Sequence, residues 1–159
     1  MILRDATGAD AGALESFDLG EQPSVWLDEV TEIVAGLVRS QHDEHQTELD
    51  RRVVVAEVDG AVVAVTAHER LDHDTLGPLP EHRYVMVLAV RVDHRRSGIG
   101  SVLLESVLAE MQRDGVRTAS WLVHPANLAS AAFSRSGFPE ADETYPPDER
   151  PYVRFTLRL

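Results

Sequence analysis

The sequence of 159 residues predicts a single α/β domain in which a mixed, mostly antiparallel sheet is flanked by helices. Three observations predict this class. Segments with the apolar period of a helix alternate with β-rich segments. Two β-rich runs flank Asp59-Gly60, which is a strong hairpin signal. A run of residues rich in β-branched side chains, at 83–92, leads directly into a glycine-rich turn and a helix. The length suits one domain with its own core.

The first fifty residues are predicted to hold one strand and two helices. Residues 2–7 have the composition of a short strand, and Thr7 is placed to cap a helix over residues 9–17. A longer helix begins at Ser24, because apolar residues then recur at intervals of three and four. Those residues are Trp26, Leu27, Val30, Ile33, Val34, Leu37 and Val38. Residues 41–50 are polar on every face, which suits a helix end or a loop.

The middle of the chain is predicted to be mainly strand. Residues 53–58 and 61–70 should pair as the two arms of the hairpin. Residues 71–82 contain a glycine and two prolines and predict a loop. Residues 83–92 are rich in β-branched side chains without alternation, which is typical of a central strand covered on both faces.

Helix and strand signals alternate again in the C-terminal third. The helix after the glycine-rich turn should end at Gly115. Its apolar face consists of Ile99, Val102, Leu103, Val107 and Met111. Residues 116–123 and 151–159 are predicted strands, and Asn127 is placed to cap a helix over residues 128–136. The predicted order is β-α-α-β-β-β-α-β-α-β.

Charge is distributed unevenly along the chain. Residues 1–90 hold 18 acidic and 6 basic side chains, a net charge of −12, whereas residues 91–159 hold 9 of each. Because nucleic-acid binding needs clustered cations, this balance speaks against a nucleic-acid partner. It suits either a cationic small molecule or peptide, attracted over a long range, or ordinary solubilising charge.

Composition also limits the chemistry and the compartment. The chain has no cysteine, which excludes disulfides, a thiol nucleophile and cysteine-based metal sites. No apolar run approaches the roughly 20 residues that cross a bilayer, and the N-terminus lacks the features of a signal peptide. We therefore expect a cytoplasmic protein without a membrane partner.

The turn after residues 83–92 has the composition of an anion-binding site. Arg95 and Arg96 stand just before Gly98 and Gly100, where the helix begins. The first N–H groups of a helix lack internal partners and carry partial positive charge, which favours an anion. Glycines allow close backbone approach, and arginines add charge-assisted hydrogen bonds. A pyrophosphate is the predicted ligand, and a purely structural glycine turn is the alternative.

Two known nucleotide-binding motifs do not fit this turn. A P-loop would continue with Gly-Lys and then Ser or Thr, which is absent. A dinucleotide fingerprint would need its third glycine at the position of Leu103.

Two motifs instead resemble those of the GNAT superfamily of N-acetyltransferases. The first is Arg/Gln-x-x-Gly-x-Gly/Ala after a strand ending in Leu-x-Val, and "LAVRVDHRRSGIG" at residues 88–100 matches it. The second is Asn-x-x-Ala/Ser, followed by an aromatic residue and Gly-Phe, and "NLASAAFSRSGF" at residues 127–138 matches it. The resemblance covers residues 53–138. In the first fifty residues it is limited to the order of helices and strands, and members of the family use this region to recognise their substrates. It indicates one N-acetyltransferase-like domain over residues 1–159.

The resemblance implies transfer of an acyl group, most often acetyl, from coenzyme A to a primary amine, with acetyl-CoA as co-substrate. Amides of the turn would hold the pyrophosphate, and the strand at Leu88–Val90 would pair with the pantetheine arm where it splays from the next strand. The Val90 N–H would polarise the thioester carbonyl. The implied acyl-CoA-binding residues are Leu88, Ala89, Val90, Arg95, Arg96, Ser97, Gly98, Ile99, Gly100, Ser101, Asn127, Ser130 and Phe133.

The sequence departs from the family at both proton-transfer positions. The tyrosine that often acts as acid, four residues before the glycine of the Gly-Phe pair, is replaced by Phe133. The positions that often hold a Glu or His base are Met86 and Tyr84. Tyr84 is the catalytic candidate, because it could relay a proton through water, and a buried structural tyrosine is the alternative. Further candidates without a predicted place are Glu69, Glu81, His82 and His124.

Other residue clusters carry weaker signals. Four histidines, His42, His45, His68 and His73, have acidic neighbours, but no His-x-x-x-His pair lies on a predicted helix with a third ligand, so no metal is predicted. In the family, the region that includes residues 20–23, Val25 and Trp26 borders the acceptor site. A tryptophan at helical spacing is more often a core residue than part of a substrate-binding wall.

The leading hypothesis is an acyl-CoA-dependent N-acyltransferase that acts on a small-molecule or peptide amine. A non-catalytic acyl-CoA-binding or regulatory module is the competing hypothesis, motivated by Phe133. Acetylation of protein amines is a third. Whether the chain forms a homodimer is left open.

Overall fold

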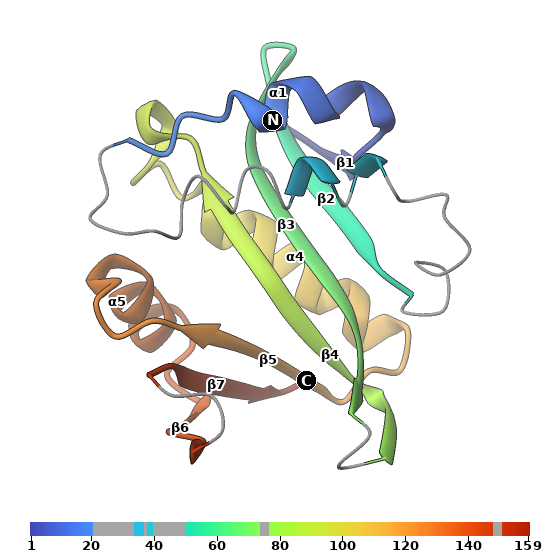
Figure 1. Cartoon of the computed structure of the whole chain (residues 1–159), viewed down its shortest axis with the longest axis vertical. Helices are drawn as coiled ribbons and strands as arrows, with labels where there is room; N and C mark the ends of the chain where they lie inside the picture. Colours follow the sequence, from blue (N-terminus) through green and yellow to red (C-terminus); the bar gives the residue numbers. More distant parts are fainter. Residues whose placement is uncertain (21–33, 37, 40–49, 74–76, 148–150) are drawn as a thin grey trace. The chain divides into compact units, whose positions relative to one another are not determined.

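The computed structural model describes residues 1–20, 34–36, 38–39, 50–73, 77–147 and 151–159 (Figure 1). Its strands are β1 (Ile2–Asp5), β2 (Arg52–Val58), β3 (Ala61–His73), β4 (Gly77–Val90), β5 (Thr118–Val123), β6 (Asp142–Thr144) and β7 (Val153–Arg158). Its helices are η1 (Gly8–Asp10) and η2 (Val92–His94), both 3₁₀, and the α-helices α1 (Ala11–Glu15), α4 (Ile99–Arg113) and α5 (Leu128–Gly137).

The described strands form one seven-stranded sheet in the order β1-β2-β3-β4-β5-β7-β6. β4 and β5 run parallel, whereas β1–β2, β2–β3, β5–β7 and β6–β7 are antiparallel pairs. Parallel neighbours need a crossover connection, which α4 supplies between β4 and β5. The predicted α/β class with a mixed, mostly antiparallel sheet and helices is confirmed.

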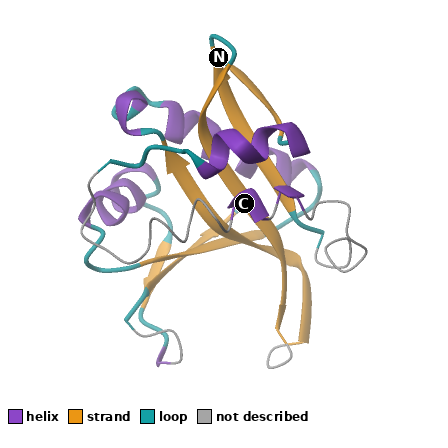
Figure 2. Ribbon diagram, turned by 45° about the horizontal axis from the view of Figure 1, so that its top comes forward, coloured by secondary structure: helices purple, strands orange, loops and turns teal. Residues whose placement is uncertain are grey.

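The chain divides into two compact units, and the first consists of Met1–Glu69 and Val87–Val107. Helix α1 lies on one side of its strands, and the beginning of α4 lies behind them (Figure 1, Figure 2). The inner valines of the paired strands β2 and β3 form the centre of its core, because none of them is more than 2% exposed. These are Val53, Val55, Val63 and Val65.

The second unit consists of Arg70–Met86 and Leu108–Leu159. Trp121 of β5 stacks on Phe155 of β7, with ring centroids 5.9 Å apart, and meets Phe138 edge-on at 5.4 Å. Its Nε1–H donates to Ser134 Oγ at 2.9 Å in a buried hydrogen bond. These contacts fix α5 against β5 and β7. The prediction that the chain forms a single domain stays a prediction.

The predicted hairpin at Asp59-Gly60 is confirmed. Asp59 has a φ of 51° and Gly60 a φ of 81°. Positive φ at both central residues is the requirement of a type I′ turn, whose twist matches the flanking strands. The register then joins Val58 to Ala61 across the turn.

The predicted loop at residues 71–82 is wrong, because β3 extends to His73 and β4 begins at Gly77. Pro78 and Pro80 cannot donate to a strand ladder. Since they are two residues apart, their missing N–H groups fall on the same edge of β4 and leave the other edge able to pair. The sequence showed prolines but not which edge of the strand they would occupy.

The prediction for β4 is correct in position and wrong in burial. It is the fourth of the seven described strands and therefore central. Val85 is buried, but residues 86–90 are all only half-buried. The register with β5 joins His82–Val85 to Thr118–Trp121, and residues 86–90 lie beyond it. The second half of β4 therefore keeps part of its surface accessible.

Helix α4 follows its prediction with one correction. Val102 is 43% exposed and does not belong to the buried face. That face consists of Leu103, Leu104, Val107, Leu108 and Met111. Val102 lies one residue, or about 100°, away from this row on the helix surface. The predicted stop is confirmed, because Gly115 takes a φ of 83° and its N–H bonds the Gln112 carbonyl.

At the N-terminus, the predicted helix over residues 9–17 is divided into η1 and α1. Thr7 precedes it, as predicted, and donates from its backbone N–H and its hydroxyl to Asp10. Asp10 is buried, and both of its carboxylate oxygens accept from Arg4 at 2.8 Å. These hydrogen bonds from Arg4 hold the pKa of Asp10 well below its ordinary value.

Two further elements differ from the prediction. Strand β6 was not predicted, because three polar residues give no strand signal until they pair with β7. Of the predicted helix over residues 24–38, the described residues 34–36 and 38 are helical, and the others lie outside the described residues. None of the described helices is long and apolar enough to span a membrane.

Candidate functional site

Residues 95–101, which we call the cradle turn, lead from η2 into the first turn of α4. Arg96 and Gly98 have positive φ angles of 59° and 82°. The N–H of Val102 bonds the Gly98 carbonyl at 3.0 Å, so the N–H groups of the three residues between them have no acceptor within the helix. Free N–H groups at a helix start form a site for an anion.

The two glycines of the cradle turn serve different purposes. A Cβ at Gly98 would meet nothing within 4 Å, so glycine is favoured there by its positive φ alone. A Cβ at Gly100 would lie 3.2 Å from Val90 Cγ2, so glycine there lets α4 approach the end of β4 closely. The Ser97 hydroxyl donates to the His94 carbonyl and ties the turn to η2.

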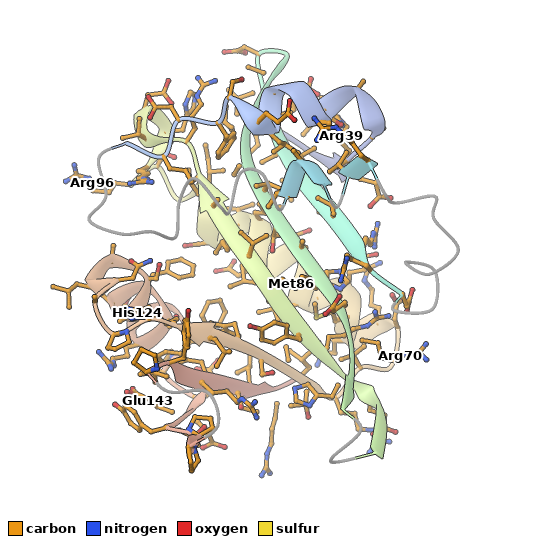
Figure 3. All side chains as sticks on the ribbon, in the orientation of Figure 1. Arg39, Arg70, Met86, Arg96, His124 and Glu143 are labelled. Carbon is orange, nitrogen blue, oxygen red and sulfur yellow. The ribbon has the colours of Figure 1, made fainter. Side chains whose placement is uncertain are left out.

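The two arginines also differ. Arg95 Nε donates to the Val90 carbonyl at 3.1 Å, and its Nη2 donates to the Leu19 carbonyl at 2.5 Å. Arg96 is exposed, points away from the ribbon and makes no hydrogen bond or ion pair with the described residues (Figure 3). Contact of either arginine with phosphate stays a prediction. Of the two, Arg96 is the one whose guanidinium has no partner among the described residues. Sequence reasoning missed Leu19, which is 76 residues from its partner.

The other charged groups next to the cradle turn compensate one another. Arg91 donates to both carboxylate oxygens of Asp93 at 2.8 and 2.9 Å, and His94 Nδ1 lies 2.7 Å from the same carboxylate. These hydrogen bonds, that from Arg91 first, lower the pKa of Asp93. The Asp93 charge is therefore already paired, which leaves Arg96 as the cation that a ligand at the turn would meet.

The end of β4 presents backbone groups on the edge opposite β3. The Arg91 N–H donates to the Val63 carbonyl at 2.9 Å. Because successive peptide groups of a strand point to opposite edges, the N–H and C=O of Val90 point away from β3. The predicted stretch Leu88–Val90 is half-buried and belongs, with the cradle turn, to the first unit.

The second predicted motif lies in the second unit, at the start of α5. Asn127 is the N-cap as predicted, since its Oδ1 accepts from the Ser130 N–H at 3.1 Å. Phe133 is half-buried and meets Phe138 edge-on at 5.9 Å. These contacts explain the capping and aromatic positions of the motif by local structure alone. Binding of acyl-CoA by Asn127, Ser130 and Phe133 stays a prediction.

A comparison with families of known sequences decides the relationship. The profile of the Acetyltransferase (GNAT) family matches residues 14–138. The chain belongs to this GNAT family. Comparison with curated proteins gives no match.

Solved GNAT structures share the fold over the full length of this chain. PaiA N-acetyltransferase from Thermoplasma acidophilum, in complex with coenzyme A, is 13% identical with a TM-score of 0.73, over 99% of this chain and 98% of that one. Ribosomal-protein-alanine N-acetyltransferase from Brucella melitensis is 21% identical with a TM-score of 0.73, over 100% of both chains. A GNAT acetyltransferase from Brucella melitensis, in complex with acetyl-CoA, is 18% identical with a TM-score of 0.68, over 99% and 87%.

The catalytic candidate of this GNAT chain, Tyr84, lies on β4 within the second unit. It is half-buried and stands in register with Ser120 of β5, so the two side chains share one face of the sheet. His82 lies two residues earlier on that face, and its Nε2 is 2.8 Å from the Ser120 hydroxyl. The structure therefore places His82, a candidate without a predicted position, in a polar group with Ser120 beside Tyr84.

The remaining acid and base candidates have partners of their own. Glu69 pairs with Arg51 at 2.5 Å, and Glu81 pairs with Arg117 at 3.2 Å. His124 Nδ1 accepts from the Ala126 N–H at 3.2 Å.

The described residues of this GNAT chain contain no group of three His, Asp or Glu side chains that could hold a metal ion. His68 is a buried residue of β3. His42, His45, Val25, Trp26 and residues 21–23 lie outside the described residues, and the side chain of His73 is not described.

Proposed function

We propose that the chain is an acyl-CoA-dependent N-acyltransferase that transfers acetyl from acetyl-CoA to a primary amine. The cradle turn carries this proposal, because it combines free helix N–H groups, a glycine with positive φ and an uncommitted arginine in a chain of the GNAT family. The residues present fit a pyrophosphate: the space next to Gly98 is open and the nearby carboxylate of Asp93 is already paired. Solved structures with this fold in complex with coenzyme A or acetyl-CoA support the same ligand.

Each part of the first unit has a task in this proposal. The N–H groups of the cradle turn would hold the pyrophosphate, with Arg96 adding a charge-assisted hydrogen bond. The edge of β4 at Leu88–Val90 would pair with the extended pantetheine arm. The Val90 N–H, which points to that edge, would polarise the thioester carbonyl as charge develops on its oxygen.

Proton transfer is the second requirement. An alkyl amine with a pKa of about 10 must lose a proton before it attacks. We assign this step to Tyr84, which would relay the proton of the amine through water to the solvent. Phe133 has no proton to donate, so coenzyme A would leave as a thiolate, which is tolerable because a thiol has a pKa of about 8.5.

The acceptor class follows from charge. Residues 1–90 carry a net charge of −12, which favours a cationic or neutral amine over an anionic one. An alanine N-terminus belongs in the test, since a structurally similar protein is named as a ribosomal-protein-alanine N-acetyltransferase. Higher salt should raise the KM for a cationic amine, because screening acts beyond about 8 Å at physiological salt.

The test is release of the coenzyme A thiol from acetyl-CoA. The amines are a linear polyamine, a lysine-containing peptide, a peptide with N-terminal alanine and, as the anionic case, glutamate. Turnover with one of the first three supports the proposal. Preference for glutamate refutes the acceptor class, and absence of coenzyme A binding in a titration refutes the proposal.

Two glycine variants show whether the cradle turn is the site. Gly98 and Gly115 have φ angles of 82° and 83°, and a Cβ at either meets nothing within 4 Å. Alanine should therefore destabilise both positions equally, by up to about 1.5 kcal/mol, because the entropy that glycine loses on folding offsets part of the left-handed cost. Only Gly98→Ala should weaken coenzyme A binding, since Gly115 is at the other end of α4. Equal affinity in the two folded variants would exclude the cradle turn.

The second candidate function is a non-catalytic acyl-CoA-binding module, which Phe133 favours because it stands where the family often has a tyrosine acid. Coenzyme A binding at the cradle turn without turnover on any amine would support this candidate.

A further inference from the structure

The segment Asp18–Gly20 lies against the cradle turn, although more than 70 residues of sequence separate them. Arg95 connects the two, because its guanidinium donates to the Leu19 carbonyl at 2.5 Å and to the Val90 carbonyl at 3.1 Å. One side chain thus bridges the N-terminal segment and the end of β4, within the first unit.

Two further contacts join the same segment to η2. The Val92 N–H donates to the Asp18 carbonyl at 2.8 Å. Gly20 packs so closely on Val92 that a Cβ would lie 2.8 Å from Val92 Cγ2 and 3.3 Å from Val92 Cβ. Gly20 also has a φ of 70°, and its N–H donates to Asp18 Oδ1 at 2.7 Å. Both the backbone angle and the contact therefore require glycine at this position.

These contacts hold a turn that is costly to keep in place. Arg96 takes a left-handed conformation that an L-residue rarely adopts, and such conformations persist where the surroundings determine them. The Arg95 guanidinium donates charge-assisted hydrogen bonds to the Val90 carbonyl at the end of β4 and to the Leu19 carbonyl of the N-terminal segment. These bonds hold the first residue of the cradle turn in place.

We propose that Asp18–Gly20 supports the phosphate-binding conformation of the cradle turn and that Arg95 is the positioning residue that connects them. The inference rests on the proposed function, because it assumes that the turn binds coenzyme A. Linkage is reciprocal, so coenzyme A at the turn should in turn stabilise Asp18–Gly20.

Hydrogen exchange of the full chain with and without coenzyme A measures this connection. Coenzyme A should slow exchange in the cradle turn and also in residues 17–20. Arg95→Ala should abolish the protection of residues 17–20 even at saturating coenzyme A. Arg95→Lys, which keeps one donor group, should restore part of it. Arg96→Ala is the matched control, which should lose affinity and keep the coupled protection.

A second variant changes the segment Asp18–Gly20 and leaves Arg95 in place. Gly20→Ala should displace the neighbouring Leu19 carbonyl from the Arg95 guanidinium. Coenzyme A binding should then weaken by about tenfold, the loss expected for that one charge-assisted hydrogen bond. Because residue 20 is assigned no phosphate contact, the dependence of affinity on salt should stay as in the parent, whereas Arg96→Ala should reduce it. Gly12→Ala is the control, since a Cβ there meets nothing within 4 Å and its φ is not positive. Circular dichroism verifies that each variant is folded.

The possible failures are distinguishable. If the parent chain binds no coenzyme A, the proposed function fails and this inference fails with it. If coenzyme A protects the cradle turn and leaves residues 17–20 unchanged, or a folded Gly20→Ala variant binds as the parent does, the inference alone is refuted.

Discussion

Replacing Arg96 by glycine should raise stability and lower coenzyme A affinity at once. Arg96 has a φ of 59°, and this left-handed conformation costs an L-residue about 1–2 kcal/mol. Glycine avoids that cost but loses roughly 0.5–1 kcal/mol more in conformational entropy on folding. Since the described residues give the Arg96 side chain no partner to lose, Arg96→Gly should raise the free energy of unfolding by up to about 1.5 kcal/mol. Arg96→Ala keeps the strained angle and should change stability little.

The affinity for coenzyme A should fall in both Arg96 variants. Both variants remove the guanidinium, and the loss of one charge-assisted hydrogen bond to phosphate weakens binding by about tenfold. The difference from the parent should shrink at high salt, because exposed charges are screened. Urea unfolding followed by circular dichroism gives the stability, and titration calorimetry at low and high salt gives the affinity.

Two results would refute this reasoning. If Arg96→Gly is no more stable than Arg96→Ala, the left-handed angle does not carry the assumed cost. If both variants bind coenzyme A as tightly as the parent at low salt, Arg96 does not contact the phosphates.

Three further outcomes are expected. Gly100→Ala should leave stability within about 1 kcal/mol, because gained helix propensity offsets the 3.2 Å contact with Val90 Cγ2, and should weaken coenzyme A binding by displacing that residue. Asp10→Asn should lower the free energy of unfolding by about 1–3 kcal/mol at pH 7, since it breaks the ion pair between buried Asp10 and half-buried Arg4. The pKa of Asp10 is lowered by folding, so its stabilisation is present above pH about 4 and should disappear as pH falls further. Phe133→Tyr should leave kcat similar or raise it modestly, within the roughly 10²-fold that a weak general acid supplies, as measured by thiol release against pH.

Each of these predictions has a control variant or a result that would contradict it. Asp5→Asn breaks the exposed ion pair with Arg52 and should cost less than about 1 kcal/mol, so an equal loss would contradict the role of burial. If kcat of the parent falls at high pH with an apparent pKa that Tyr84→Phe abolishes, a tyrosine acid exists and the acid-free reading of Phe133 is wrong. Unchanged coenzyme A affinity in Gly100→Ala would mean that the packing of Val90 is not part of the site.

The features that the sequence predicted well are those set by local chemistry. Asp59-Gly60 demands a turn with two positive φ angles, and Asn127 supplies a cap to an N–H three residues away. Gly98 marks the cradle turn for the same reason, since its angle is required by its neighbours in sequence.

The features that it missed depend on partners far along the chain. The contact of Arg95 with the Leu19 carbonyl could not be predicted, because 76 residues of sequence separate the two. Pro78 looked like a loop residue because the sequence does not show that β4 lies between β3 and β5 and begins at Gly77. Val102 looked like a core residue because apolar character does not say which of two adjacent rows of a helix is covered.

The buried position of Trp121 gives the chain an optical probe of its own. The indole is 7% exposed, lies between Phe138 and Phe155, and donates to Ser134 of α5. Its fluorescence should therefore be blue-shifted and should move to longer wavelength when α5 leaves the sheet. Since Trp26 is the other tryptophan, a Trp26→Phe background isolates this emission. Phe133 lies one residue before Ser134. The emission of Trp121 can therefore follow in real time the movement of α5, the helix on which Phe133 replaces the usual tyrosine acid.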